Sequence, residues 1–150
     1  MGDRLLAGLR RAGAGRRGVA AIGSDHPELT AEQVDAAFAL LAQGADVVLG
    51  PALDGGYTLI AVRPAALHAE LFAEISWSTA AVLDETLARC RALGLAVHLL
   101  PEGTDVDTPD DLARLTGRLA ASPEPACPAT RSLLARWGRL EPCRTALGDR

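Results

Sequence analysis

Lysine is absent from this 150-residue chain, because all fifteen of its basic residues are arginines. A phosphate-loop lysine, a Schiff-base lysine and a lysine general base are therefore excluded within the chain. Positive charge is not in surplus either, since the formal net charge is −4, which excludes the basic footprint of a nucleic-acid-binding domain. No uninterrupted apolar run approaches the length of a membrane-spanning helix, so we expect no membrane span.

Cysteine is scarce, and its spacing does not fit a metal site. Cys90, Cys127 and Cys143 lie far apart, and an odd number of cysteines fits no closed disulfide framework. We expect reduced thiols in a cytoplasmic protein, with Cys90 buried on a helix. The chain is 49% apolar and only 23% charged, which predicts a folded globular protein rather than a disordered one.

Apolar runs and helix-start signals alternate along the chain. Thr30 with Gln33 forms a capping box, and Thr108 is an N-cap before Pro109 at the first helical position. The second and third apolar runs are too close for a parallel crossover, so the sheet has to be mixed. The pattern predicts an α/β domain over residues 1–121, followed by a Pro-rich linker and a C-terminal helix and tail over residues 122–150. Strands are expected at residues 18–23, 45–49, 57–62 and 95–100, and helices at 3–12, 30–43, 64–72, 79–93, 108–121 and 130–137.

Three of the predicted strands are each followed by an acidic loop. Asp25 follows the first strand, Asp54 the second, and Asp105 and Asp107 the fourth. In an open α/β sheet, ligands bind outside the carboxyl ends of the strands, where such loops gather. Carboxylates that meet there repel one another unless a cation joins them. Oxygen ligands without a cysteine cluster favour Mg²⁺ or Mn²⁺, completed by substrate phosphates. The sequence therefore predicts a divalent-cation site, provided that the three loops meet.

Each of these residues also has a simpler, structural interpretation. Asp25 could have no role beyond capping a turn before Pro27. His26 is expected to be a surface or hydrogen-bonded side chain rather than a ligand. Asp54 with Gly55 is a hairpin signal by itself. The glycine pair that begins at Gly55 equally allows a ligand to approach the backbone closely. The sequence leaves these alternatives open.

The segment around Trp77 has two interpretations of the same kind. Trp77 could belong to the core, or it could stack on a base or a sugar. Ser78 and Thr79 are most simply helix caps.

Four motifs taken together resemble a known family. GSDHPELT (residues 23–30), GPALDGGYTLI (50–60), ISWSTAAVL (75–83) and DVDTPDDL (105–112) occur in this order. The chain resembles bacterial glycosyltransferase-A-like transferases, some of which are called radical SAM/selenodomain-associated transferases. It is also similar to nucleotidyltransferases such as 2-phospho-lactate guanylyltransferase and the molybdenum-cofactor guanylyltransferase. The resemblance covers roughly residues 3–137, and four ordered motifs are far more specific than any one of them.

The resemblance implies a fold and a set of site residues. The fold would be the Rossmann-like nucleotide-diphospho-sugar transferase (GT-A) fold, an α/β/α sandwich with a mixed, mostly parallel sheet. Asp25 would bind the metal in a D-x-D-like loop, and Asp105 with Asp107 would supply its second acidic contact. Asp25 and Asp54 are the expected catalytic residues. The expected substrate-binding residues, which include the acceptor or sugar side at 54–57, are Ser24, Gly55, Gly56, Tyr57, Trp77, Ser78 and Thr79.

The chemistry implied is the transfer of a glycosyl group from a nucleotide-activated small-molecule donor to an acceptor. The first alternative is nucleotidyl transfer of the 2-phospho-lactate guanylyltransferase type. In either case the metal would neutralise the diphosphate charge that develops at the breaking bond. The second alternative is a non-catalytic protein that binds a nucleotide or a metal.

The chain departs from the family pattern at its N-terminal end. Family members begin with a strand and a loop containing Gly, Arg and Lys that holds the nucleotide, whereas this chain starts near the helix at residues 1–6. The expectation is an N-terminally truncated domain that lacks the first strands, roughly two βα units. Such a fragment could dimerise to cover an open sheet edge.

Overall fold

The computed structural model describes residues 1–122 and 127–140. The chain divides into two compact units, Met1–Asp105 and Val106–Arg150. This division falls earlier than the expected linker at residues 122–128, of which 123–126 lie outside the described residues. The boundary predicted after residue 121 therefore stays a prediction.

The first unit is built on a four-stranded mixed sheet. Its strands are β1 (Val19–Ile22), β2 (Val47–Pro51), β3 (Tyr57–Val62) and β4 (Val97–Leu99), arranged in the order β1-β3-β2-β4. Strand β3 is antiparallel to both of its neighbours, and β2 is parallel to β4. The reversal predicted between the second and third strands is therefore confirmed. Strands β1, β2 and β4 run in the same direction, so their carboxyl ends share one edge of the sheet.

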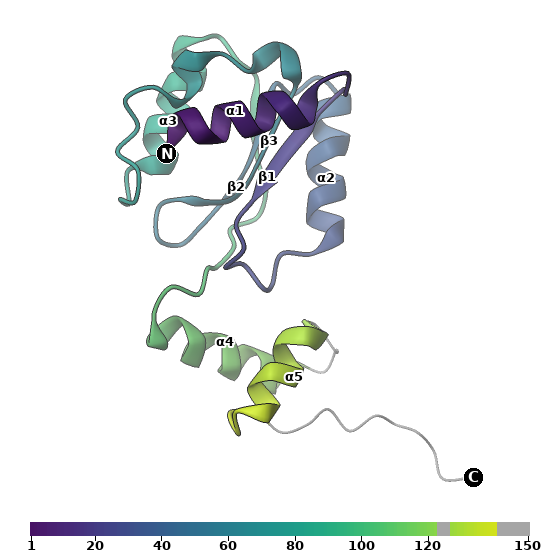
Figure 1. Ribbon diagram of the computed structural model, residues 1–150, viewed down its shortest axis with the longest axis vertical. Helices are drawn as coiled ribbons and strands as arrows, with labels where there is room; N and C mark the ends of the chain where they lie inside the picture. Colours follow the sequence, from purple (N-terminus) through teal and green to yellow (C-terminus); the bar gives the residue numbers. More distant parts are fainter. Residues whose placement is uncertain (123–126, 141–150) are drawn as a thin grey trace, which may run out of the picture. The chain divides into compact units, whose positions relative to one another are not determined.

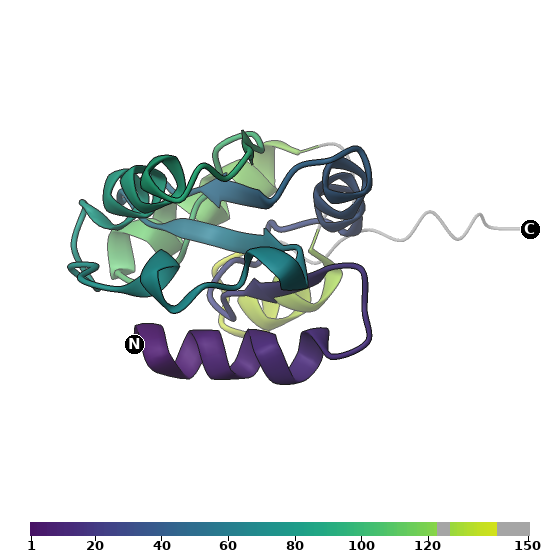
Figure 2. The same ribbon diagram turned by 90° about the horizontal axis from the view of Figure 1, so that it is seen from above.

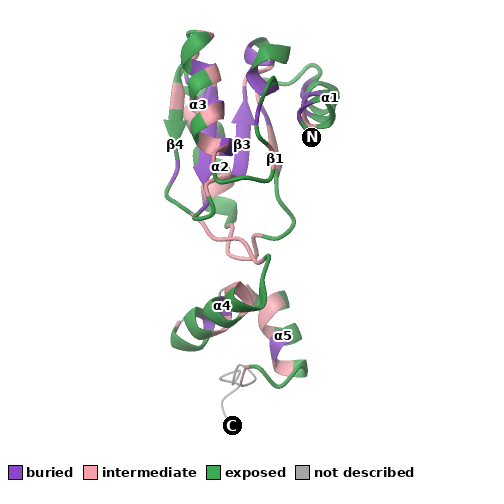
Figure 3. Ribbon diagram, turned by 90° about the vertical axis from the view of Figure 1, so that its left-hand side faces the viewer, coloured by how far each residue is buried: buried purple, intermediate pink, exposed green. Residues whose placement is uncertain are grey.

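Helices cover both faces of this sheet (Figures 1 and 2). Helix α2 (Ala31–Ala42) lies on one side of the strands and α3 (Val82–Ala92) on the other. The core that contains α3 also includes residues from α1 (Gly2–Gly13) and from two 3-10 helices, η1 (Pro64–Ala66) and η2 (Ala69–Phe72). This three-layer arrangement explains why β2 and β3, both central, consist almost entirely of buried residues (Figure 3).

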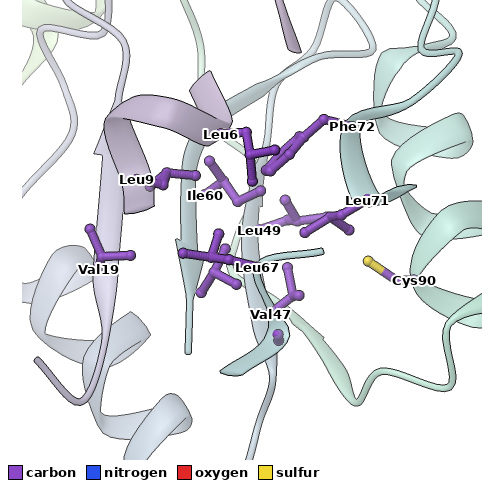
Figure 4. Close-up of a cluster of buried hydrophobic side chains, with 12 residues drawn as sticks. Leu6, Leu9, Val19, Val47, Leu49, Ile60, Leu67, Leu71, Phe72 and Cys90 are labelled. Carbon is purple, nitrogen blue, oxygen red and sulfur yellow. The ribbon is translucent and has the colours of Figure 1, made fainter. Parts of the chain in front are cut away.

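Side chains alternate between the two faces along each central strand. Val47 and Leu49 of β2 join the core cluster under α1 and α3 (Figure 4), whereas Val48 joins the cluster under α2. Ile60 and Ala61 of β3 divide in the same way. Because both faces are covered, the strands read in the sequence as continuous apolar runs rather than as alternating ones.

The helix boundaries follow from the signals in the sequence, with two corrections. The capping box of α2 is present, with Gln33 N 3.3 Å from Thr30 Oγ1 and Thr30 N 2.9 Å from Gln33 Oε1. Phe38, which the helical pattern places inward, is 38% exposed and borders a groove shared with Arg17 and Gly18. Helix α3 begins at Val82 rather than at residue 79. Cys90 of α3 is fully buried, as predicted, and burial raises its pKa to about 11.

Strand β4 is shorter and more exposed than its apolar run predicts. It pairs with β2 alone, and Leu99 is 51% exposed at this edge of the sheet. An edge strand also carries apolar residues on its buried side. The apolar run at residues 95–100 therefore does not show whether the strand is central or lies at an edge.

The second unit contains two helices, α4 (Pro109–Ala121) and α5 (Pro128–Arg136). Leu115 and Leu119 of α4 pack with Leu134 of α5 in a small core of their own. The predicted cap at Thr108 is confirmed and extended, since Asp111 completes a capping box with it. Cys143 and the predicted tail beyond residue 140 lie outside the described residues.

Candidate functional site

Three loops meet at the edge of the sheet where β1, β2 and β4 end. The loop after β2 is joined to the loop after β4 by a parallel bridge between Ala52 and Gly103, with Gly103 N 2.8 Å from Pro51 O. The loop after β1 reaches the same loop through Thr104, as described below. Asp25, Asp54 and Asp105 therefore lie on loops at one edge, as the sequence predicts.

The loop after β1 folds tightly around His26. The His26 side chain is only 7% exposed, and its Nε2 lies 3.2 Å from Asp25 Oδ1. A Cβ added at Gly23 would lie 2.4 Å from the imidazole ring and 2.5 Å from Asp25 Oδ1. Any larger residue here would have to displace the His26 ring and the Asp25 carboxylate, which both fold back over the backbone. Asp25 remains 47% exposed and faces solvent in part.

The loop after β4 is held to the loop after β1 by Thr104. His26 Nδ1 lies 3.3 Å from Thr104 O, and the Thr104 hydroxyl donates a hydrogen bond of 2.9 Å to Glu28 Oε2. Beneath them, Thr58 is buried, and its hydroxyl donates to Gly50 O at 3.2 Å. The residue that directly precedes Asp105 is thus anchored to the loop that carries Asp25.

The loop between β2 and β3 is a turn closed by Asp54. Asp54 Oδ1 accepts a hydrogen bond of 2.8 Å from Gly56 N, so the predicted hairpin signal forms a real turn. Gly55 has a φ of +89°, and a Cβ there would lie 2.2 Å from Ala80 O. Leu83 N donates to Gly55 O at 2.9 Å. The double glycine therefore allows this turn to pack against the start of α3.

The segment before α3 is the one that carries Trp77, Ser78 and Thr79. Trp77 is half-buried and packs against the core, so the core interpretation describes its position. Ser78 has a left-handed φ of +63°, which is uncommon for a residue with a side chain. The Thr79 hydroxyl donates to Ser76 O at 2.7 Å and accepts from Ala81 N at 3.3 Å, which is a capping role. A substrate contact of any of the three stays a prediction.

Tyr57, the first residue of β3, points into the core. Its hydroxyl is buried beside Thr86 and has no hydrogen-bond partner of normal geometry within residues 1–122 and 127–140. The Thr86 hydroxyl instead donates to Val82 O at 2.8 Å. Burial raises the pKa of Tyr57 to about 12, and the nearby Thr86 hydroxyl opposes that rise only in part. Through its hydroxyl, Tyr57 contacts the core rather than the loop edge.

The carboxylates at this edge do not form a complete metal cage. Across the described part of the chain, no group of three or more His, Cys, Asp or Glu side chains could hold a metal ion. Mg²⁺ is usually bound by one or two carboxylates together with substrate phosphates. Asp25 and Asp105 stay predicted ligands of a cation of that kind. Asp107 belongs to the second unit and stays a predicted ligand.

A small cavity of about 30 Å³ lies at the loop edge. It is lined by His26, Glu28, Thr58 and Thr104 among others and has room for one or two water molecules. A larger groove of about 470 Å³ includes Arg17 and lies at the other end of the sheet.

Three residues of this edge were not singled out by the sequence as functional: His26, Glu28 and Thr104. His26 was expected to be a surface or hydrogen-bonded side chain, and it is hydrogen-bonded and buried. Nothing in the sequence connects Glu28 with Thr104, because 76 positions separate them. Their partnership is a property of the sheet topology.

Solved structures identify the class of fold. A crystal structure from Desulfovibrio desulfuricans G20, described as a candidate nucleotide-diphospho-sugar transferase, matches with a TM-score of 0.76 and 32% sequence identity. The match covers 91% of this chain and 62% of that chain, so the chain spans about three-fifths of the length of that protein. The fold is thus the Rossmann-like nucleotide-diphospho-sugar transferase (GT-A) fold.

A family model identifies the chain more narrowly. The family described as "uncharacterized protein conserved in bacteria (DUF2064)" matches residues 1–79, which is more than half of the chain. The chain belongs to this family. No curated protein matches it. None of the helices within the described residues is long and apolar enough to cross a membrane.

Proposed function

We propose that this chain belongs to a metal-dependent transferase that moves a glycosyl group from a nucleotide-sugar donor to an acceptor. The observation that carries the proposal is the 32% identity over 91% of the chain to a candidate nucleotide-diphospho-sugar transferase. The convergence of Asp25 and Asp105 on one edge of the sheet supports it, since ligands of open α/β sheets bind at this edge. The narrower assignment to the radical SAM/selenodomain-associated type is part of the proposal.

The side chains at the edge have distinct parts in this proposal. Asp25 and Asp105 would hold Mg²⁺ or Mn²⁺, which when bound neutralises charge on the donor diphosphate. The turn closed by Asp54 would border the acceptor or sugar side. Its glycines place the backbone there without a Cβ, and Ser24 and the segment 77–79 would border the donor.

Nucleotidyl transfer is the second candidate. The proposed ligands Asp25 and Asp105 would suit any nucleotide with a bound cation, whether a sugar nucleotide or a nucleoside triphosphate. Product analysis after incubation with a sugar nucleotide or with a nucleoside triphosphate separates the two chemistries. A homodimer is a further part of the proposal.

The test of the proposed function is ligand-dependent thermal stability. We expect Mn²⁺ together with UDP, GDP or GTP to raise the unfolding midpoint, because binding to the native state stabilises by RT ln(1 + [L]/Kd). Asp25→Asn should remove the rise and leave the ligand-free midpoint near that of the native protein. If none of these nucleotides raises the midpoint with Mn²⁺, the proposed function is wrong for this chain and the non-catalytic alternative is left.

A further inference from the structure

We propose that His26, Glu28 and Thr104 form a clamp that positions Asp25 and Asp105 relative to each other. The clamp rests on the proposed function, in which these two carboxylates share a cation. Its three residues would act as positioning residues and would not touch the substrate.

The need for a clamp follows from the order of the strands. Strands β1 and β4 lie at opposite edges of the sheet, with β3 and β2 between them. Neighbouring strands are about 4.8 Å apart, so three intervals separate β1 from β4 by roughly 14 Å. The loops that follow β1 and β4 can meet only by folding over the ends of β3 and β2. Sheet pairing alone does not bring Asp25 and Asp105 together.

Thr104 forms the β4 side of the clamp and uses two groups. Its carbonyl oxygen lies 3.3 Å from His26 Nδ1, and its hydroxyl donates to Glu28 Oε2 at 2.9 Å. These two contacts add to the hydrogen bonds of Gly103 with Pro51 O and Leu53 N in holding the peptide that leads into Asp105. Both partners come from the loop after β1.

His26 forms the β1 side of the clamp. Its ring is 7% exposed and packs on Gly23, where an added Cβ would lie 2.4 Å away. The enclosed ring places Nε2 3.2 Å from Asp25 Oδ1 and turns Nδ1 toward Thr104 O. A neutral imidazole donates from one of these nitrogens and an imidazolium from both. Asp25 Oδ1 and Thr104 O are both acceptors, so the neutral ring donates to one of them and packs beside the other, whereas the imidazolium donates to both.

The test compares two substitutions of Thr104 that differ in a single hydroxyl. Thr104→Val keeps the shape but cannot donate to Glu28, whereas Thr104→Ser keeps the donor. The first measurement needs no ligand: hydrogen exchange of the Gly103 amide, which is bonded to Pro51 O at 2.8 Å. We expect about fivefold faster exchange in Thr104→Val, the change that losing one hydrogen bond produces, and a rate close to the native one in Thr104→Ser.

The second measurement is the Kd of Mn²⁺ by electron paramagnetic resonance, for Mn²⁺ alone and with UDP or GDP added. We expect Thr104→Val to weaken binding about fivefold and Thr104→Ser to restore it. A structural role alone would leave this Kd unchanged. The clamp is wrong if Thr104→Val exchanges like the native protein, or if both variants weaken Mn²⁺ binding equally. If the native protein binds no Mn²⁺ under any condition while the exchange result holds, the loop connection stands, but its role in positioning metal ligands and the proposed function both fail.

Discussion

Replacing Gly55 by alanine should destabilise the first unit strongly, and the structure divides the cost into two parts. The first part is conformational, because Gly55 has a φ of +89°, which costs a residue with a side chain about 1–2 kcal/mol. The second part is steric, because the new Cβ would lie 2.2 Å from Ala80 O, a backbone atom that cannot rotate away. Overpacking of this kind costs about 1–3 kcal/mol. The expected sum is roughly 2–5 kcal/mol, a large share of the roughly 5–15 kcal/mol that stabilises a typical domain.

Gly94 provides the matched control for this prediction. It also has a left-handed φ, +67°, but an added Cβ there would meet no atom within 4 Å. Gly94→Ala should therefore cost only the conformational part, about 1–2 kcal/mol. Both variants are compared with the native protein by urea unfolding followed by circular dichroism, with equal m-values as the check that the comparison is valid. If Gly55→Ala is no more destabilising than Gly94→Ala, the close packing of the Asp54 turn on the start of α3 is wrong.

Two further predictions concern ionisable groups. Cys90 is completely buried and its pKa is raised, so iodoacetamide at pH 8 should leave it unmodified in the folded protein, whereas the half-buried Cys127 should react. Mass spectrometry of the alkylated peptides measures the labelling of each cysteine. Equal labelling of the two would contradict the burial of Cys90. The pKa of Asp46 is lowered, chiefly by a hydrogen bond from the Ala96 backbone and next by one from Arg63. A lowered folded pKa contributes stability that is present above the unfolded value of 3.8 and is lost as the pH falls through the folded value. Urea midpoints between pH 5 and pH 2.5 should therefore fall less steeply in Asp46→Asn than in the native protein, and identical slopes would refute the assignment.

Local signals in the sequence predict most of the elements of this fold. The capping box at Thr30, the N-cap at Thr108 and the short spacing between β2 and β3 are local chemistry, and the structure confirms all of them. The extent of β4 and the exposure of Phe38 are not local properties. Both depend on which neighbours a segment meets in the folded sheet, and apolar residues look alike in the sequence whether one or two faces are covered.

The candidate site, like the fold, could be predicted from the sequence only in part. The acidic loops could be predicted because they follow strands, and parallel strands place their carboxyl ends together. The partners of His26 could not, because Thr104 lies 78 positions away, beyond three further strands. The inward direction of Tyr57 was also hidden, since a tyrosine after two glycines has the same sequence whether it points toward a ligand or toward the core.

The distance along the chain between the two sides of the clamp also bears on how this protein folds. The β2–β3 hairpin closes a turn of a few residues, whereas the contact between His26 and Thr104 closes a loop of 78. Loop-closure entropy grows with the logarithm of loop length, so this contact costs on the order of 2 kcal/mol more than a ten-residue closure. The hairpin can therefore form early, and the acidic edge is completed only when β1 and β4 have both joined it. A ligand that needs both sides of the clamp would then bind only to chains in which the whole sheet has formed.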